Sequence, residues 1–183
     1  MKFTETKLRG AFIITPDLIE DDRGFFARTF CRSEFEEHRL NSDIVQCNIS
    51  FNKNKGTLRG MHYQAKPHAE VKLVRCSAGA IYDVIVDLRP ESSTFKQWFA
   101  MELSAENYKM LYIPEGFAHG FQTLTGTAEI IYHHSEFYSP DSARGLRFDD
   151  PALGIAWPLP VSMVSIRDQS YPIIDKHFKG IET

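Results

Sequence analysis

Several features that would direct this chain to particular protein classes are missing from its sequence. It holds three cysteines, an odd number without paired spacing, which argues against a disulfide framework or a zinc site. No apolar run approaches the roughly 20 residues that cross a bilayer, and charged residues follow Met1 in place of a secretory signal pattern. These absences predict a soluble, cytoplasmic protein in a reducing setting, with no membrane partner.

A strong excess of charge is missing as well. The formal net charge is −3 over 183 residues, which argues against general binding to nucleic acid, so an anionic ligand must meet a local cluster of cations. The sequence has neither a glycine-rich phosphate loop nor a Rossmann fingerprint, and we therefore expect no nicotinamide cofactor. Hydrophobic residues make up 43% of the chain, which predicts one folded domain over residues 1–183.

Short alternating or apolar segments recur along the chain and predict an all-β fold. They are rich in Val, Ile, Phe and Tyr and are bounded by Gly, Pro, Asn or Asp, as strands are. The predicted strands cover residues 10–15, 43–50, 72–76, 80–88, 98–103, 110–113, 121–124 and 128–133. Their number and spacing favour a sandwich or a barrel.

Little helix is expected between these strands. Ser33 and Glu36 match a capping box, which predicts a short helix that begins at Ser33. Residues 104–107 are predicted to form a single helical turn. After Pro140 prolines become frequent, and the sequence predicts a loop-rich C-terminal tail packed over the barrel.

The segment from Thr57 to Gln64 carries the strongest chemical signal. It places Arg59 and His62 on strand-like sequence, and Lys72 follows ten residues after the histidine. Histidine has a pKa suited to a base near neutral pH. A nearby cation can hold the negative charge that forms when a carbon acid loses its proton. For this segment alone, the alternative is a surface strand whose polar side chains face water.

Two pieces of the sequence resemble halves of a cupin signature. A His62-x-Gln64 pair is followed by Glu70, and a Pro-Glu-Gly-Phe-Ala-His run ends at His119. A metal-binding jelly roll would use a second histidine where Gln64 stands, and an amide oxygen is a weak ligand for a transition metal. We therefore expect no metal, while strand alternation should still bring His62 and His119 into one cavity.

Tyr132 lies on a late predicted strand and precedes two adjacent histidines. A buried tyrosine is usually a core residue. In a cavity that holds a histidine base, however, it is the natural acid to return a proton from the opposite face. His133 and His134 must point to opposite sides of the strand, and we interpret both as surface or packing residues. Asp168 is either a solvated turn carboxylate or, if its segment folds back, the partner that orients His62.

Arg23 and Arg59 are the cations that accompany Lys72. Single arginines are usually exposed, and Arg23 lies in a turn-like Asp-Asp-Arg-Gly segment. Together the three cations would supply the local positive charge for a diphosphate, which arginine binds with its planar fork.

With these motifs in order, the sequence resembles the nucleotide-sugar 3,5-epimerases, typified by dTDP-4-dehydrorhamnose 3,5-epimerase. The resemblance covers nearly the whole chain and is carried by residues 22–26, 46–48, 58–64, 71–75, 113–121, 144–145 and 149–158. It implies a cupin-like jelly-roll barrel that works without cofactor or metal, forms a homodimer and binds a nucleotide-diphosphate sugar.

The resemblance also implies a reaction, which is inversion of C3, C5 or both on a nucleotide-linked 4-keto-6-deoxy hexose. The first choice is dTDP-4-dehydro-6-deoxy-D-glucose, which would become dTDP-4-dehydro-L-rhamnose in a pathway to rhamnose-containing polysaccharide. By analogy His62 is the base, supported by Asp168, Tyr132 is the acid, and Lys72 lies near the developing enolate. The positions that match substrate-lining residues of the family are Arg23, Gln46, Asn48, Arg59 and His119.

Two departures from the family pattern concern the nucleotide. Arg28 and Ala143 stand where the family usually has glutamates. Arginine only donates hydrogen bonds and cannot accept one from thymine N3–H, whereas cytosine presents acceptors that a guanidinium could meet. The alternatives for Arg28 are contact with a phosphate and a position that faces solvent. The open alternatives are a CDP-linked or other nucleotide sugar, inversion at a single carbon, and a sugar-binding cupin without turnover. An opposed acid and base, His62 and Tyr132, argue against the last alternative.

Overall fold

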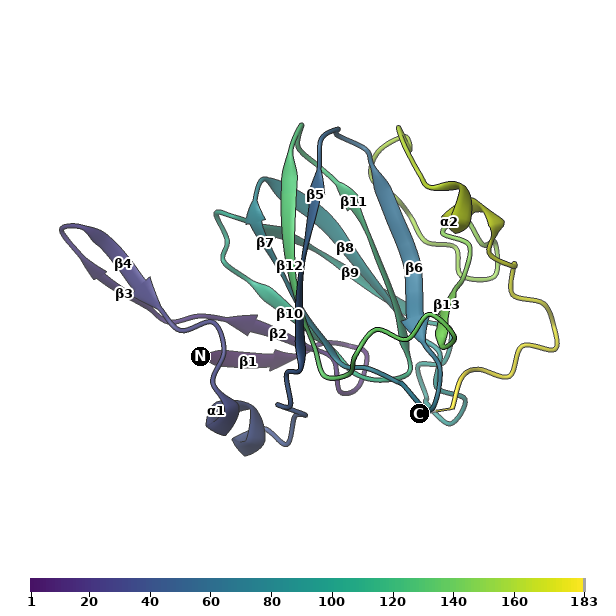
Figure 1. Ribbon diagram of the computed structural model, residues 1–183, viewed down its shortest axis with the longest axis horizontal. Coiled ribbons are helices and arrows are strands. Elements are labelled where there is room, and N and C mark those ends of the chain that lie inside the picture. Colours follow the sequence, from purple (N-terminus) through teal and green to yellow (C-terminus); the bar gives the residue numbers. More distant parts are fainter. Residues whose placement is uncertain (183) are drawn as a thin grey trace.

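Two antiparallel β-sheets stack face to face in the computed structural model, which describes residues 1–182 (Figure 1). The six-stranded sheet has the order β1 (Lys2–Glu5), β2 (Phe12–Thr15), β10 (Met110–Ile113), β7 (Lys72–Ala78), β12 (Ala128–His134) and β5 (Gln46–Asn52). The five-stranded sheet has the order β13 (Ala143–Gly145), β6 (Leu58–Gln64), β11 (Phe117–Thr123), β8 (Ala80–Asp87) and β9 (Trp98–Ser104). The predicted all-β, cupin-like jelly roll is confirmed.

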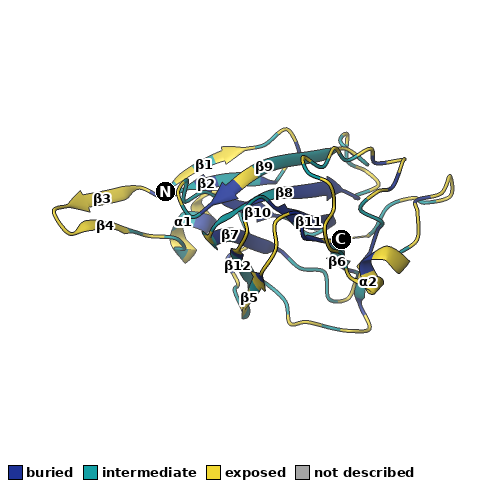
Figure 2. Cartoon of the chain, turned by 90° about the horizontal axis from the view of Figure 1, so that it is seen from above, coloured by how far each residue is buried: buried dark blue, intermediate teal, exposed yellow. Residues whose placement is uncertain are grey.

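The main core fills the space between the two sheets. Alternation along β7 turns Val74 and Cys76 inward, where they meet Ile85 of β8, Phe121 of β11 and Ile130 of β12. Burying one such large apolar side chain contributes about 1.5–3 kcal/mol. Figure 2 shows this pattern, with β7, β8 and β11 largely buried. Strands β7, β8, β11 and β12, each predicted at least in part from an apolar run, therefore close this core.

A two-stranded hairpin leaves the barrel and is exposed along its length (Figures 1 and 2). It consists of β3 (Leu18–Asp21) and β4 (Gly24–Ala27), with Arg23 in the turn. The sequence predicted the turn but neither strand, and it also missed β1. In β11 the predicted strand covered only residues 121–124, whereas the observed strand begins at Phe117 and includes His119 of the cupin-like motif.

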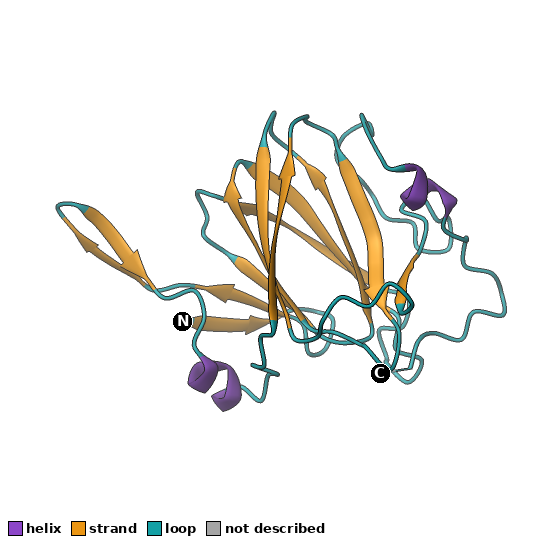
Figure 3. Ribbon diagram, in the orientation of Figure 1, coloured by secondary structure: helices purple, strands orange, loops and turns teal. Residues whose placement is uncertain are grey.

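Two short helices lie outside the sheets (Figure 3). Helix α1 (Arg32–Glu37) buries Phe35 against the outer face of the six-stranded sheet. The predicted capping box is wrong. Cys31 occupies the N-cap, and the Ser33 hydroxyl shares a hydrogen bond with the Cys31 thiol at 3.1 Å. Within residues 1–182, neither helix is long and apolar enough to span a membrane.

The predicted helical turn over residues 104–107 is also wrong. The Ser104 and Asn107 side chains each accept a hydrogen bond from the other residue's backbone N–H, and these contacts close a tight turn after β9. Ser and Asn compete for local backbone groups in this way, which explains why they favour turns over helices.

The C-terminal tail is loop-rich, as predicted, and covers the five-stranded sheet (Figure 1). It contains helix α2 (Ile166–Ser170), which the sequence did not predict. Buried Asp150 anchors the tail by accepting hydrogen bonds from the backbone N–H groups of Ala152 and Ile174. With the tail held in this way, α2 packs against β6.

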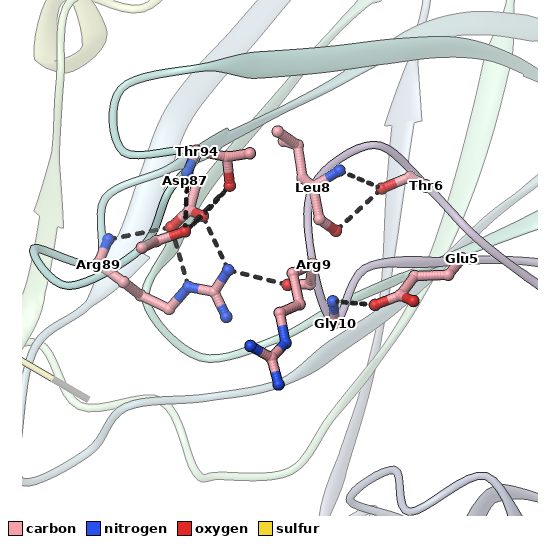
Figure 4. Close-up of polar contacts among 9 residues, drawn as sticks. Glu5, Thr6, Leu8, Arg9, Gly10, Asp87, Arg89 and Thr94 are labelled. Atoms are coloured by element: carbon pink, nitrogen blue, oxygen red, sulfur yellow. Dashed lines mark hydrogen bonds and ion pairs between the residues drawn. The ribbon is translucent and has the colours of Figure 1, made fainter.

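A buried polar network ties the end of β8 to the loop before β2 (Figure 4). Asp87 is fully buried and accepts hydrogen bonds from the Arg89 guanidinium at 2.8 and 2.9 Å. The hydroxyls of Ser92 and Thr94 donate to the same carboxylate. Arg89 also donates to the carbonyl oxygen of Arg9 at 2.8 Å. This network stabilises the end of the barrel where two distant loops meet.

Candidate active site

A cavity of about 280 Å³ opens between the two sheets. Strands from both sheets contribute to its walls, so residues far apart in the sequence meet there. Of the residues predicted to form the site, those that line the cavity are Asn48, Arg59, His62, Lys72, His119 and Tyr132.

Close approach of β6 and β11 places two histidines side by side. Gly60 has φ +128°, and a Cβ there would lie 2.5 Å from the Cα of Gly120. Glycine is therefore required at this contact. The register pairs His62 directly with His119, so both rings lie at the cavity.

His62 is held by a carboxylate from the tail. Its Nε2 lies 2.8 Å from Oδ1 of Asp168 on α2, and the other carboxylate oxygen accepts from the Gly60 backbone N–H. The His62 side chain is 43% exposed and that of Asp168 only 5%. Burial raises the pKa of Asp168, but the contact with His62 and the hydrogen bonds from Gly60 and Ser165 together lower it by more, so the net pKa lies below its ordinary value. The predicted contact is present and orients the ring.

Tyr132 faces the cavity from the other sheet. It lies on β12 of the six-stranded sheet, whereas His62 lies on β6 of the five-stranded sheet. Burial raises the pKa of Tyr132 well above its ordinary value, and the nearby carboxylate of Asp83 adds to the shift. The phenol therefore stays protonated at neutral pH and can act as an acid.

His119 and Arg59 are also fixed before any ligand binds. His119 Nε2 lies 2.7 Å from Oδ1 of Asp83, and both side chains are buried. The Nε of Arg59 donates to Oδ1 of Asn52 at 2.8 Å. Rings and guanidinium groups that are held in this way need little reorganisation when charge develops nearby.

Lys72 reaches the cavity from β7. Its Nζ lies 3.0 Å from the Glu70 carboxylate and 3.4 Å from the His62 carbonyl oxygen. The second oxygen of Glu70 lies 2.7 Å from Nδ1 of His134, which lines the cavity as well. Of the two alternatives predicted for His134, surface or packing residue, the first is wrong, because its side chain is largely buried and its ring packs on Tyr132 at the cavity. Strand alternation offered the signal, because His134 follows Tyr132 by two residues on one face.

The comparisons with known proteins agree with this geometry. The family model of dTDP-4-dehydrorhamnose 3,5-epimerase matches residues 5–176, which include the cavity strands and α2. The chain belongs to this family. It is an isomerase of the carbohydrate epimerase class.

Individual members of the epimerase family are similar over nearly their whole length. A dTDP-4-dehydrorhamnose 3,5-epimerase from Shigella flexneri is 43% identical over 169 residues, 92% of this chain and 93% of the relative. The crystal structure of the enzyme from Elizabethkingia anophelis has a TM-score of 0.93 at 42% identity, covering 97% of this chain and 98% of that one. The dTDP-6-deoxy-D-glucose-3,5-epimerase of Legionella pneumophila, in complex with dTDP-4-keto-L-rhamnose, has a TM-score of 0.88 at 38% identity, covering 94% and 92%.

Three predicted substrate-binding residues lie outside the cavity of their own chain. Arg23, at the hairpin tip, pairs with Asp21 at 2.6 Å. Arg28, just after β4, pairs with Glu34 at 2.8 Å. Gln46 accepts a hydrogen bond from the backbone N–H of Tyr138, a cavity residue, and so supports the wall from behind.

The side chains considered for a metal site are engaged elsewhere. Gln64 donates to the carbonyl oxygens of His68 and Phe137 and accepts from the Ser139 N–H, which fixes two loops. His62 and His119 each bind a carboxylate. Among residues 1–182, no group of three or more His, Cys, Asp or Glu side chains is arranged to hold a metal ion.

Sequence reasoning missed several residues of the cavity wall. They come from the tail and its adjoining loop, and they are Tyr138, Arg144, Arg167 and Tyr171. Arg167 precedes Asp168 on α2, so the fold that brings the carboxylate to His62 also brings this cation. The position of Arg167 next to Asp168 was the one signal in the sequence that could have identified it as a cavity residue. Ala143, one of the two departures from the family pattern, lines the cavity too.

Proposed function

We propose that this protein inverts C3 and C5 of dTDP-4-dehydro-6-deoxy-D-glucose to give dTDP-4-dehydro-L-rhamnose. The observation that carries the proposal is one cavity with the His62 base on one sheet and the Tyr132 acid on the other. Inversion needs a proton to leave one face of a carbon and another to arrive at the opposite face. A base and an acid on facing walls meet that requirement.

The chemistry runs through an enolate. The C4 ketone acidifies the hydrogens on C3 and C5, and His62 removes one of them while Asp168 holds the ring. With Nε2–H directed to Asp168, the Nδ1 lone pair accepts the proton. Lys72 stabilises the charge that develops on the ketone oxygen. Tyr132 then protonates the carbon from the other face, leaving a histidinium and a tyrosinate that must exchange protons with solvent before the next inversion.

The substrate's diphosphate finds its counter-charges at the cavity wall. Arg59, Arg144 and Arg167 all line the cavity and supply fixed positive charge. Arginine suits this role because its planar fork matches phosphate oxygens and stays charged at any physiological pH. These three groups explain how a chain of net charge −3 can bind a dianion.

A homodimer completes the site in this proposal. Ile19 and Phe26 of the hairpin are 66% and 72% exposed, and Ile49 and Phe51 of β5 are 66% and 53% exposed. Apolar surface of this kind is typical of a covered interface. Packing a second copy onto it would carry Arg23 to the partner's cavity. The three free thiols are in keeping with a cytoplasmic setting for this dimer.

A CDP-linked sugar is the second candidate substrate. Ala143 lines the cavity where the family pattern has a glutamate, and Arg28 replaces the other one. The chain thereby lacks two hydrogen-bond acceptors that would favour a thymine base, whereas His62, Lys72 and Tyr132 are retained.

The test is proton NMR in deuterated water with a panel of dTDP- and CDP-linked 4-keto sugars, after exhaustive chelation. We expect deuterium to replace the hydrogens at C3 and C5 of the dTDP sugar, with formation of the L-rhamno product. Exchange at one carbon would identify a single-carbon epimerase. Absence of exchange with every sugar would refute the proposed function, and activity that returned only with added metal would favour a metal-dependent cupin.

A further inference from the structure

A buried carboxylate bridges two residues that face each other across neighbouring strands. The register pairs Lys72 of β7 directly with His134 of β12. Two basic side chains at such a position gain nothing from each other and repel when both are charged. Glu70, just before β7, contacts both, with Oε1 3.0 Å from the lysine Nζ and Oε2 2.7 Å from the histidine Nδ1. All three side chains are largely buried, with exposed fractions of 9–12%.

This carboxylate has an unusual place in a cavity that is otherwise suited to anions. Among the cavity-lining residues of the described chain, Glu70 is the only carboxylate. Burial raises its pKa, but the charge of Lys72 and the contact with His134 lower it by more, so the net pKa lies below its ordinary value. A permanent negative charge here works against binding a diphosphate. It must therefore contribute something that the cations alone do not.

The donors of Lys72 show what that contribution is. An ammonium group has three N–H donors. One is directed to Glu70, and a second lies 3.4 Å from the carbonyl oxygen of His62. These two contacts leave the third N–H for a ligand oxygen in the cavity that Lys72 lines. Glu70 therefore decides the direction in which this cation acts.

His134 in turn holds Glu70 in place. Its ring stacks on Tyr132 with centroids 5.9 Å apart and an interplanar angle of 19°. Its Nε2 lies 3.3 Å from the Asn48 amide nitrogen, which can donate to it while Nδ1–H donates to Glu70. Because both oxygens of the Glu70 carboxylate are engaged, the carboxylate cannot rotate to contact the third N–H of Lys72. The network thus joins the Tyr132 wall to the Lys72 ammonium.

We propose that Glu70 and His134 are positioning residues that aim the Lys72 ammonium at the enolate oxygen. The inference rests on the proposed epimerase function and extends it to two residues outside the acid–base set. Because full negative charge exists on that oxygen only as the reaction proceeds, the two residues act on kcat and have little effect on KM.

The first test compares Glu70→Gln, His134→Leu and His134→Asn in the NMR exchange assay. Glu70→Gln and His134→Leu should lower kcat by about 10- to 100-fold, less than the roughly 100- to 1,000-fold cost of deleting a charge-stabilising donor. KM should stay within about threefold. His134→Asn keeps an N–H near the Nδ1 position and should recover most of the loss. The matched control is His133→Leu, which changes the neighbouring histidine on the opposite face and should leave kcat unchanged.

The second test repeats Glu70→Gln in a Lys72→Met background. If Glu70 acts through Lys72, the second substitution should lower the exchange rate hardly further, because residues in one network are not additive. An equal loss in both backgrounds would overturn the proposal, as would unchanged kcat in Glu70→Gln. Thermal melting identifies any variant that fails to fold. If His134→Leu does not fold, the kcat values of the two single variants Glu70→Gln and His134→Asn test the proposal. Absence of exchange in the wild-type protein would refute the epimerase function instead.

Discussion

Two buried groups of the proposed proton path have pKa values shifted in opposite directions, although burial by itself raises both. The phenol of Tyr132 keeps its proton because desolvation and the charge of Asp83 both raise its pKa. The carboxyl of Asp168 is buried too, yet hydrogen bonds from His62 and the Gly60 N–H keep its pKa below the ordinary value. A neutral acid that lines the cavity can therefore coexist at neutral pH with an ionised carboxylate that holds the His62 ring.

Arg28 gives a residue-level prediction about nucleotide choice. Its side chain is 61% exposed and pairs with Glu34 in its own chain, so it can turn toward a partner's ligand at little cost. Arg28→Glu should shift the ratio of kcat/KM toward dTDP over CDP sugars by about 5- to 100-fold, the effect of one exchanged polar pair. Arg28→Gln, which can both donate and accept, is the control and should lie between. An unchanged ratio would show that Arg28 does not read the base.

The proposed catalytic residues could be chosen from the sequence because each combines a titratable group with strand alternation. His62, Lys72 and Tyr132 all satisfy both conditions, and the cavity contains all three. The Glu70–His134 bridge could not be chosen in this way. The bridge forms because the register between β7 and β12 places Lys72 opposite His134. Alternation shows which face of a strand a side chain occupies, but it does not show which residue of another strand lies opposite.

At the level of elements, the Asp87 network shows how a buried charge can stabilise a junction. Burial raises the pKa of Asp87, but the Arg89 guanidinium and two hydroxyl donors outweigh it and leave the pKa below its ordinary value. A lowered folded-state pKa means that the stabilisation is complete above the unfolded-state pKa. It is lost as the pH falls through the folded-state value.

Asp87→Asn should therefore destabilise the protein in a pH-dependent manner. At pH 7 the free energy of unfolding should fall by about 2–4 kcal/mol, because a buried charge pair loses one partner. As the pH falls below the unfolded-state pKa of about 3.9 and through the lower folded-state pKa of Asp87, the wild-type carboxylate becomes protonated, so the difference between the two proteins should narrow. Urea unfolding at several pH values measures both effects. Glu91→Gln, an exposed change in the same loop, should leave stability unaltered, and a pH-independent loss in Asp87→Asn would contradict the account.

Strand prediction worked where burial is two-sided and failed for exposed strands, and the five-residue helix was missed as well. Strands β8 and β10 are almost wholly buried, and their apolar runs predicted them closely. The β3–β4 hairpin packs on little of its own barrel, so its sequence has no in–out alternation to read. Helix α2 has five residues, too few for a periodic signal.

At the scale of the whole molecule, the hairpin makes a prediction about assembly. If Arg23 serves the cavity of the partner, Arg23→Ala and His62→Ala should complement each other when the two chains are co-expressed with different tags. A mixed dimer would then hold one cavity with both residues intact, and activity should exceed that of either variant alone. If Arg23 serves its own chain, or if the protein is monomeric, the mixture should stay as inactive as its parts.

The barrel also explains why the full cavity could not be assembled from the sequence. Its walls combine strands of both sheets with α2, which lies more than one hundred residues beyond β6. Alternation tells which side chains share a face, but the pairing of distant strands follows from the closed fold. The tail residues Arg144 and Arg167 reach the cavity only through that closure.

In the proposed mechanism His62 and Tyr132 act from opposite faces of the same carbon. The most direct measurement follows deuterium incorporation and net inversion separately, by proton NMR in deuterated water, for His62→Ala and Tyr132→Phe. His62→Ala should lower both rates by about 10²- to 10⁴-fold, because no proton is removed. Tyr132→Phe should keep incorporation much faster than inversion, because the base remains and the opposed acid is lost. Near-normal turnover in His62→Ala would contradict the claim.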